Sequence, residues 1–141
     1  MSSGAERVFL DANVLVSAAY SKSSRLREFW RSPEAELVTS EFALEEARRN
    51  LLVYHPDGIP CLEELASQLH VVAEASEATS LPAGLDLADK DRPVLAAAVA
   101  ARCTHLLTGD TRHFQALYGR RVAGVLVLTP AQYLRRKSGL R

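Results

Sequence analysis

The sequence predicts an α/β fold with a parallel sheet and crossover helices. Short apolar runs alternate with segments of helical periodicity along the whole chain, which is typical of βαβ units. The two runs that look most buried, at 8–10 and 105–107, are each followed within three residues by an aspartate. At 141 residues the chain is long enough to bury one core, so we expect a single domain over 1–141.

Five segments have the apolar, β-branched character of strands, and helical patterns lie between them. Strands are expected at 7–11, 36–40, 70–74, 105–107 and 124–128. Helices are expected at 13–20, 23–30, 41–52, 61–69, 92–103, 111–119 and 129–137, and a polar loop at 75–91. Ser40 is the expected N-cap of the 41–52 helix, and Pro60, Pro93 and Pro130 fall in first helical turns.

Composition excludes several classes of protein. Lys and Arg total 17 and balance 17 Asp and Glu, so no overall positive field recruits nucleic acid, and a polyanion requires a local patch or a metal. The apolar runs are too short to span a bilayer and the start does not resemble a signal peptide. A cytoplasmic protein is therefore expected.

Cysteine and histidine spacing does not predict a zinc or redox site. Cys61 and Cys103 lie far apart and form no C-x-x-C, which favours free, buried thiols. The histidines lack zinc spacing and are interpreted as surface or loop residues: His55, His70, His105 and His113.

Four acidic residues are predicted to converge at one edge of the sheet. Asp11 and Asp110 follow strands at their carboxyl ends, where open parallel sheets bind ligands. Asp91 precedes the alanine-rich helix, which begins at the same edge if the crossover is right-handed. Glu46 lies in the helix after the second strand. Clustered carboxylates repel one another unless a cation is present, and an all-oxygen site favours Mg²⁺ or Mn²⁺.

Each acid also has a structural explanation. Asp11 and Asp91 are suited to cap the helices that follow them, and Asp110 is suited to a turn. Glu46 lies near Arg residues at the spacing of surface ion pairs. It is less probable that several acids lie at one sheet edge for unrelated structural reasons than that any one of them does. We therefore favour a metal site that activates water for attack on a phosphodiester.

These residues resemble the PIN domain nucleases. The resemblance rests on "FLDANVLVSA", "LVTSEFALEEARRNL", "DKDRPVLAAAVAARCTHLLTGD" and "GVLVLTPAQYL", which cover nearly the whole chain in the family's order. The subgroup that it resembles most is formed by the toxin components of toxin–antitoxin systems, of the VapC type. The resemblance implies a PIN-like three-layer fold, with a central parallel sheet of about five strands flanked by helices. It also implies an Mg²⁺ or Mn²⁺ site.

The resemblance implies a role for each site residue. The four metal-binding and catalytic acids are Asp11, Glu46, Asp91 and Asp110, with Glu45 and Asp89 as the alternatives for the second and third. Asn13 and Thr108 would orient ligands from beside the metal. The implied reaction is endonucleolytic hydrolysis of RNA, and the implied partners are an antitoxin protein and a second copy of the chain in a homodimer.

Surface features suggest where RNA and partners bind, without deciding it. Basic residues cluster at 25–31, 47–49, 119–121 and 134–137, either as solvated faces or as contacts to RNA phosphates. Trp30 and Tyr20 are candidates for base stacking, although a core position is equally expected for Trp30. Apolar residues in 14–30 and 61–69 are candidates for antitoxin or dimer contacts, or for core stripes.

Two other functions remain open at this stage. The same fold can serve as a catalytically weak scaffold that binds metal or RNA. Alternatively, Asp11 is the nucleophile of an aspartate phosphoacceptor or phosphatase, a function that expects a second acid at position 13, where the chain has Asn13, and a lysine near a strand end that "LLTGD" lacks.

Overall fold

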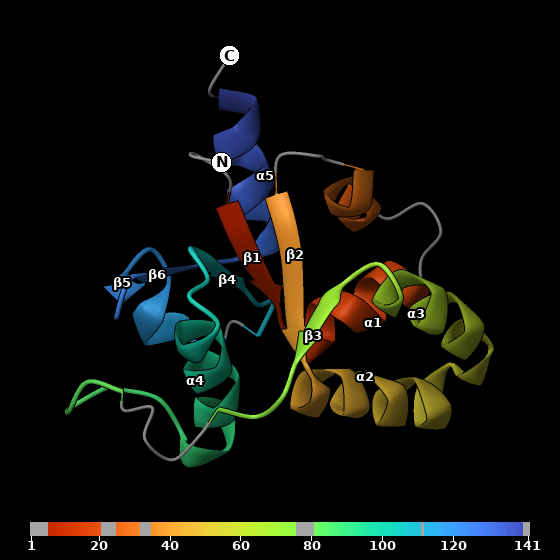
Figure 1. Cartoon of the computed structure of the whole chain (residues 1–141), viewed down its shortest axis with the longest axis horizontal. Helices are drawn as coiled ribbons and strands as arrows, with labels where there is room; N and C mark the ends of the chain where they lie inside the picture. Colours follow the sequence, from red (N-terminus) through yellow and green to blue (C-terminus); the bar gives the residue numbers. More distant parts are fainter. Residues whose placement is uncertain (1–5, 21–24, 32–34, 76–80, 111, 140–141) are drawn as a thin grey trace.

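The computed structural model describes residues 6–20, 25–31, 35–75, 81–110 and 112–139, and within these residues the strands form one sheet. The strands are β1 (Glu6–Leu10), β2 (Ala35–Ser40), β3 (His70–Val72), β4 (His105–Leu107), β5 (Arg121–Val122) and β6 (Val125–Leu128). Their order is β3-β2-β1-β4-β6-β5 (Figure 1). Every neighbouring pair is parallel except β5 and β6, which are antiparallel. The predicted α/β class is confirmed.

Helices flank the sheet. The α-helices are α1 (Ala12–Tyr20), α2 (Glu41–Tyr54), α3 (Ile59–Ala66), α4 (Arg92–Ala100) and α5 (Pro130–Gly139). Short 3₁₀ segments are η1 (Arg25–Arg31), η2 (Pro56–Gly58), η3 (Asp89–Asp91) and η4 (Gln115–Leu117). Helices α1, α2 and α3 pack against one another, whereas α4 contacts β2, β4 and α2 (Figure 1).

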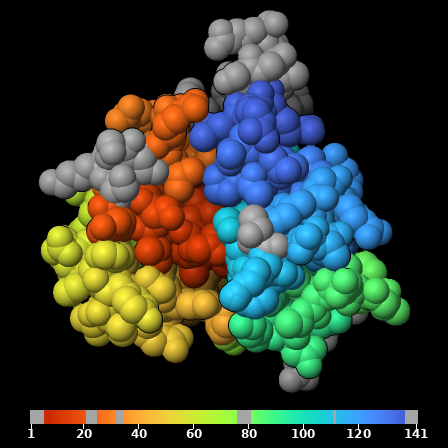
Figure 2. Space-filling model, turned by 180° about the vertical axis from the view of Figure 1, so that it is seen from behind, coloured from red at the N-terminus to blue at the C-terminus, as the bar shows by residue number. Residues whose placement is uncertain are grey.

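One hydrophobic core joins the layers. Val8, Phe9 and Leu10 of β1 and Leu106 and Leu107 of β4 have no exposed surface. Strands covered on both faces require such continuous apolar runs, which explains why they stand out in the sequence. The core extends to Tyr133 of α5, and segments from the start, middle and end of the chain meet on one face of the molecule (Figure 2). None of the helices in the described ranges is both long and apolar enough to cross a membrane.

The strand order places a switch point between β1 and β4. From β1 the chain builds outward to β2 and β3, and then returns to place β4 on the other side of β1. The backbone N–H of Asp11 donates to the carbonyl of Leu107 at 3.1 Å, so the contact between the two strands continues past the end of β1. Ligand crevices in open α/β sheets form at such a point, and here Asp11 and Asp110 both follow it.

The predicted strands are confirmed, and one strand was missed. The antiparallel β5 has two residues and joins β6 through Ala123 and Gly124, whose φ angles are 50° and 90°. Two consecutive positive φ values form the type of tight turn that closes a hairpin. Alanine at the first of these positions hides the usual Asn-Gly signal, so the sequence did not reveal the hairpin.

Two predicted helices are shorter or tighter than expected. Residues 25–31 form a 3₁₀ segment instead of an α-helix, tied to its neighbours by Arg27, which donates to the Ala18 carbonyl, and by Trp30, which donates to the Leu65 carbonyl. Within the predicted 111–119 helix only the 3₁₀ turn η4 is helical, and residue 111 lies outside the described residues. Of the predicted 75–91 loop, 76–80 lie outside the described residues, and so do 23 and 24 of the first predicted helix.

Local signals at helix starts are confirmed. The Ser40 hydroxyl accepts a hydrogen bond from the N–H of Ala43 at 3.1 Å, and Pro60, Pro93 and Pro130 lie in first turns. The free state of the two cysteines is also confirmed.

The interpretation of the histidines as surface or loop residues is wrong for His105. This residue is 7% exposed in β4, and its Nδ1 lies 2.8 Å from the Thr104 hydroxyl. A central strand carries its inward-facing residues into the core whatever their type, and here the adjacent hydroxyl satisfies the ring.

Replacing Ser40 with alanine tests the cap. Ser40→Ala should lower the free energy of unfolding by about 1 kcal/mol, because the N–H of Ala43 loses its acceptor. Urea titration measures the change, with Ser17→Ala on the exposed face of α1 as a control expected to stay within about 0.5 kcal/mol. Equal stability of Ser40→Ala and the parent would contradict the assignment.

Candidate functional site

A cleft of about 460 Å³ opens at the carboxyl edge of the sheet. The residues that line it come from the β1–α1 junction, α2, η3, α4 and the segment after β4. All four acids predicted from the sequence line this cleft, together with Asn13: Asp11, Glu46, Asp91 and Asp110. The predicted convergence of the four acids is therefore present in the structure.

Asp11 is the most deeply buried acid of the cleft, with 7% of its surface exposed. Its Oδ1 accepts a hydrogen bond from the N–H of Ala12 at 2.7 Å, so it also supports the start of α1. Burial raises the pKa of Asp11 to about 6, against hydrogen bonds from Thr108 and Ala12 that lower it, and the charges of Glu46 and Asp91 raise it further. A site that makes ionisation this unfavourable is suited to a cation.

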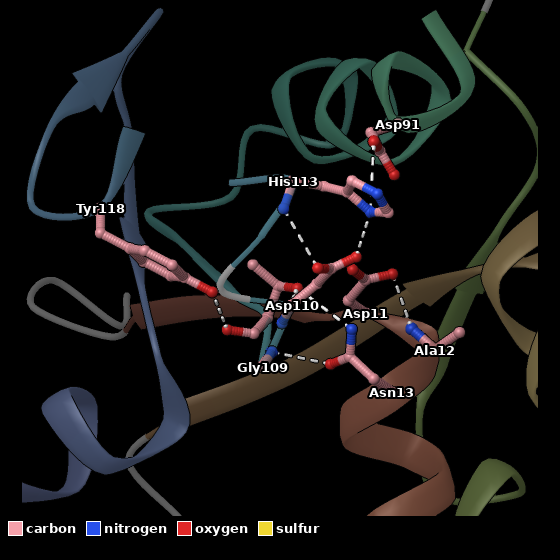
Figure 3. A network of polar contacts seen from close by, with 9 residues as sticks. Asp11, Ala12, Asn13, Asp91, Gly109, Asp110, His113 and Tyr118 are labelled. Atoms are coloured by element: carbon pink, nitrogen blue, oxygen red, sulfur yellow. Dashed lines mark hydrogen bonds and ion pairs between the residues drawn. The ribbon is translucent and has the colours of Figure 1, made fainter. Parts of the chain in front are cut away.

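Asn13 and Thr108 connect the start of α1 to the segment after β4. The Asn13 side chain accepts from the N–H of Gly109 at 2.7 Å and donates to the Thr108 hydroxyl at 3.2 Å (Figure 3). The same hydroxyl accepts from the N–H of Asp110 at 3.2 Å. With both acceptor positions of the hydroxyl engaged, its single proton is directed to the Asp11 carboxylate.

The Asp110 carboxylate is held by His113. Its Oδ1 accepts from the backbone N–H of His113 at 3.1 Å, and its Oδ2 lies 2.5 Å from the ring Nδ1 (Figure 3). Burial raises the pKa of Asp110, but the bonds and charge of His113 outweigh this effect and hold that pKa below its ordinary value. Asp110 therefore also stabilises the turn at 110–113, the structural role that the sequence suggested for it.

His113 is the site residue that sequence reasoning missed. Its interpretation as a surface or loop residue agrees with its position in the turn after β4, but this residue also lines the cleft between two acids. Nothing in zinc spacing reveals it. The signal that was available is the D-x-x-H pattern of "DTRH", because an aspartate at the start of a turn can accept from the N–H three residues on, as Asp110 does from His113.

Asp91 has an oxygen without a partner. It ends η3 immediately before α4, and its side chain makes no capping hydrogen bond, so the structure does not support its interpretation as an N-cap. Its Oδ2 is buried and has no hydrogen-bond partner in the described part of the chain. Nδ1 of His113 lies 3.8 Å from this oxygen. A buried, unpaired carboxylate oxygen is the feature expected of a ligand waiting for a cation.

The structure separates Glu46 from its neighbour Glu45. Glu45 forms a surface ion pair with Arg48 at 3.4 Å, and Arg48 binds Glu63 at 2.6 Å, whereas Glu46 lines the cleft. Asp89, the alternative to Asp91, is fully exposed and pairs with Arg92 at 3.3 Å.

Two basic residues also line the cleft. Arg49 belongs to the basic cluster noted at 47–49, whereas Lys90 was not singled out from the sequence. Neither side chain forms an ion pair with another described residue, although Arg49 is three residues from Glu46 on the same helix. Both residues are exposed and line the cleft, so their positive charges are available to an anion.

The aromatic and apolar candidates divide into core and surface. Trp30 is partly buried against the core, which agrees with the core alternative. In the predicted contact segments 14–30 and 61–69 most apolar side chains are core residues, and Tyr20, 55% exposed and stacked on His55, is the prominent exception. Large exposed apolar side chains occur instead at the end of α2: Leu52, Val53 and Tyr54.

The fold and the site define an α/β protein with an acidic cleft at the switch point of its parallel sheet. A family model described as PIN domain matches residues 7–112, which is more than half of the chain. The chain belongs to the PIN domain family.

Solved structures share this fold. A chain in the crystal structure of VapBC2 from Rickettsia felis, bound to a DNA fragment from their promoter, is 14% identical with a TM-score of 0.64, and the match covers 87% of this chain and 98% of that one. VapC20 from Mycobacterium tuberculosis, a toxin that cleaves the sarcin–ricin loop, is 14% identical with a TM-score of 0.53, covering 74% and 92%. A search of curated protein sequences finds no match.

The raised pKa of Asp11 predicts a pH-dependent stability. A carboxyl whose pKa is 3.8 in the unfolded chain and about 6 in the fold binds more protons when folded, so stability falls as pH rises between these values. At neutral pH the ionised group destabilises the metal-free protein by up to about 3 kcal/mol. Asp11→Asn should therefore raise the free energy of unfolding above about pH 6 and flatten its pH dependence.

Urea titrations in EDTA across this pH range measure the effect. Asp110→Asn is the matched control with the opposite sign, because the lowered pKa of Asp110 stabilises the fold above its unfolded pKa. An Asp11→Asn protein that is less stable than the parent at neutral pH would refute the destabilising role.

Proposed function

We propose that this protein is a metal-dependent endoribonuclease that hydrolyses RNA phosphodiester bonds, and that it is the toxin of a type II toxin–antitoxin system. The observation that carries the proposal is the set of four acids around one cleft, with a buried oxygen of Asp91 that has no hydrogen-bond partner among the described residues. Packing these carboxylates together is unfavourable without a cation. Membership of the PIN domain family and a fold shared with VapC toxins support the same function.

The donor set fits Mg²⁺ or Mn²⁺. Asp11, Glu46, Asp91 and Asp110 supply carboxylate oxygens, the ligands that these ions prefer. The bound metal would lower the pKa of the attacking water and neutralise charge on the phosphoryl oxygens. In this proposal Asn13 and Thr108 keep the two strand ends in register, so that Asp11 and Asp110 face the same point.

Arg49 and Lys90 would position the RNA. Both are unpaired within the described structure and both line the cleft beside the acids. In a chain with no net charge, such local cations supply the attraction that the composition as a whole does not. We propose that they bind phosphates that flank the scissile bond, and that the enzyme meets its RNA in the cytoplasm.

An antitoxin and a second copy of the chain are the proposed protein partners. VapBC2 from Rickettsia felis, which shares this fold, is an assembly bound to a DNA fragment from its promoter. This similarity supports the proposal that the present chain also has an antitoxin partner. On this chain the exposed apolar residues Leu52, Val53 and Tyr54 of α2 offer an apolar contact surface.

A phosphoacceptor role for Asp11 has less support. A nucleophilic aspartate must reach its substrate, whereas Asp11 is 7% exposed and engaged by Ala12 and Thr108. A noncatalytic scaffold would leave the same geometry, so only an activity assay separates it from a nuclease.

The first test is RNA cleavage. Asp91→Asn and Asp110→Asn should each lower the rate of Mg²⁺- or Mn²⁺-dependent cleavage of a labelled single-stranded RNA at least about a hundredfold, because each removes a ligand charge. EDTA should abolish cleavage by the parent protein. Glu45→Gln, one residue from Glu46 but outside the cleft, should keep the parent rate. Cleavage that is undiminished in EDTA would reject the metal mechanism, and undiminished cleavage by the aspartate variants would reject this cleft as the active site.

The second test is the salt dependence of RNA binding. In an Asp91→Asn background, Arg49→Gln and Lys90→Gln should each weaken binding and reduce the slope of log affinity against log salt by about 0.7, the loss of one phosphate contact. Arg48→Gln is the matched control, since it removes the same charge from the same helix but outside the cleft. Fluorescence anisotropy across KCl concentrations measures the slopes. Equal slopes for Arg48→Gln and Arg49→Gln would exclude the proposed contact.

A further inference from the structure

His113 lies within the acidic cleft, yet the four-acid site does not require it. One donor atom from each of Asp91, Asp110 and His113 lies within 4.8 Å of the other two, a spacing at which one ion can touch all three. Nδ1 of His113 is 2.5 Å from Oδ2 of Asp110 and 3.8 Å from Oδ2 of Asp91. The ring nitrogen therefore stands between two carboxylate oxygens (Figure 3).

The position of His113 is fixed by the fold. Its backbone N–H donates to Asp110, and the next residue, Phe114, is 1% exposed in the core. The backbone N–H of Phe114 also donates to the Asp110 carbonyl at 3.2 Å. The buried Phe114 and the hydrogen bonds to Asp110 thus hold the turn after β4 so that the imidazole of His113 lies in the cleft.

We propose that His113 is a protein ligand of the metal, binding through Nδ1 beside Asp91 and Asp110, and that it makes the site prefer Mn²⁺ to Mg²⁺. The proposal rests on the metal site of the proposed function. It adds a nitrogen donor to an otherwise all-oxygen set, and Mg²⁺ is held almost entirely by oxygen ligands, whereas imidazole suits transition metals.

The proton balance of this step is simple. Without a metal, one proton lies in the short contact between Nδ1 and Oδ2 of Asp110. A metal bound at Nδ1 would replace this proton, which would leave to solvent, and the ligand would be the neutral ring with its one proton on Nε2. The unpaired Oδ2 of Asp91 gains a partner in the same event.

The alternative is that His113 only positions Asp110. Glutamine separates the two roles, because its side-chain amide can still donate to Asp110 but offers no nitrogen ligand. His113→Ala removes both roles. His70→Gln, an exposed residue of β3 that does not line the cleft, is the matched control.

The experiment measures metal binding without RNA. Mn²⁺ is titrated into each protein and followed by the electron paramagnetic resonance of the free ion, Mg²⁺ by calorimetry. Electron spin echo modulation of the Mn²⁺-loaded protein reports coupling to an imidazole nitrogen. The parent and His70→Gln should show this coupling and His113→Gln should lose it. Mn²⁺ affinity should fall at least about tenfold in His113→Gln and Mg²⁺ affinity no more than about threefold.

Three results would overturn the inference, and they are distinguishable. Mn²⁺ binding without nitrogen coupling in the parent shows that His113 is no ligand and leaves the four-acid site standing. Equal loss of Mn²⁺ and Mg²⁺ affinity in His113→Ala, restored by His113→Gln, assigns a positioning role. Absence of any Mn²⁺ or Mg²⁺ binding by the folded parent, checked by circular dichroism, defeats the metal-dependent function as well.

Discussion

The burial of the Asp11 carboxylate at the end of β1 is the constraint on which the rest of the site depends. A carboxylate that is 7% exposed has lost most of its hydration, and its two hydrogen-bond donors, Ala12 and Thr108, do not fully replace the water. Neighbouring acids make ionisation less favourable still. A cation that shares the oxygens of Asp11 and its neighbouring acids would remove this repulsion. Without a cation, the ionised Asp11 carboxylate lowers the stability of the fold.

The order of the strands explains why Asp110 lies near Asp11. Because β4 returns to lie beside β1, the ends of two strands almost a hundred residues apart in sequence open into one crevice. The Asn13 side chain then locks the start of α1 to Thr108 and Gly109, the turn that carries Asp110. A rigid junction of this kind holds two ligand carboxylates in a fixed relation without a covalent link.

The fold was largely readable because its central strands are covered on both faces. Continuous apolar runs such as 8–10 and 105–107 leave few alternatives to buried parallel strands, and Ser40 and the first-turn prolines mark helix starts through local chemistry. The parts that were missed lack such local signals. The hairpin turn at Ala123 has no Asn-Gly pair, and the burial of His105 follows from its place in a central strand rather than from its residue type.

The sequence by itself determined the α/β class, the order of the elements and the acids that follow strands at one edge, since periodicity and chain direction suffice for these. Only the tertiary structure decided the placement of Glu46 in the cleft rather than Glu45, which turns to Arg48. It alone also revealed His113 between two acids, and Lys90 beside them in the cleft. The physical reason is that the direction of a side chain on a helix or a turn is set by packing against distant segments, which spacing along the chain does not encode.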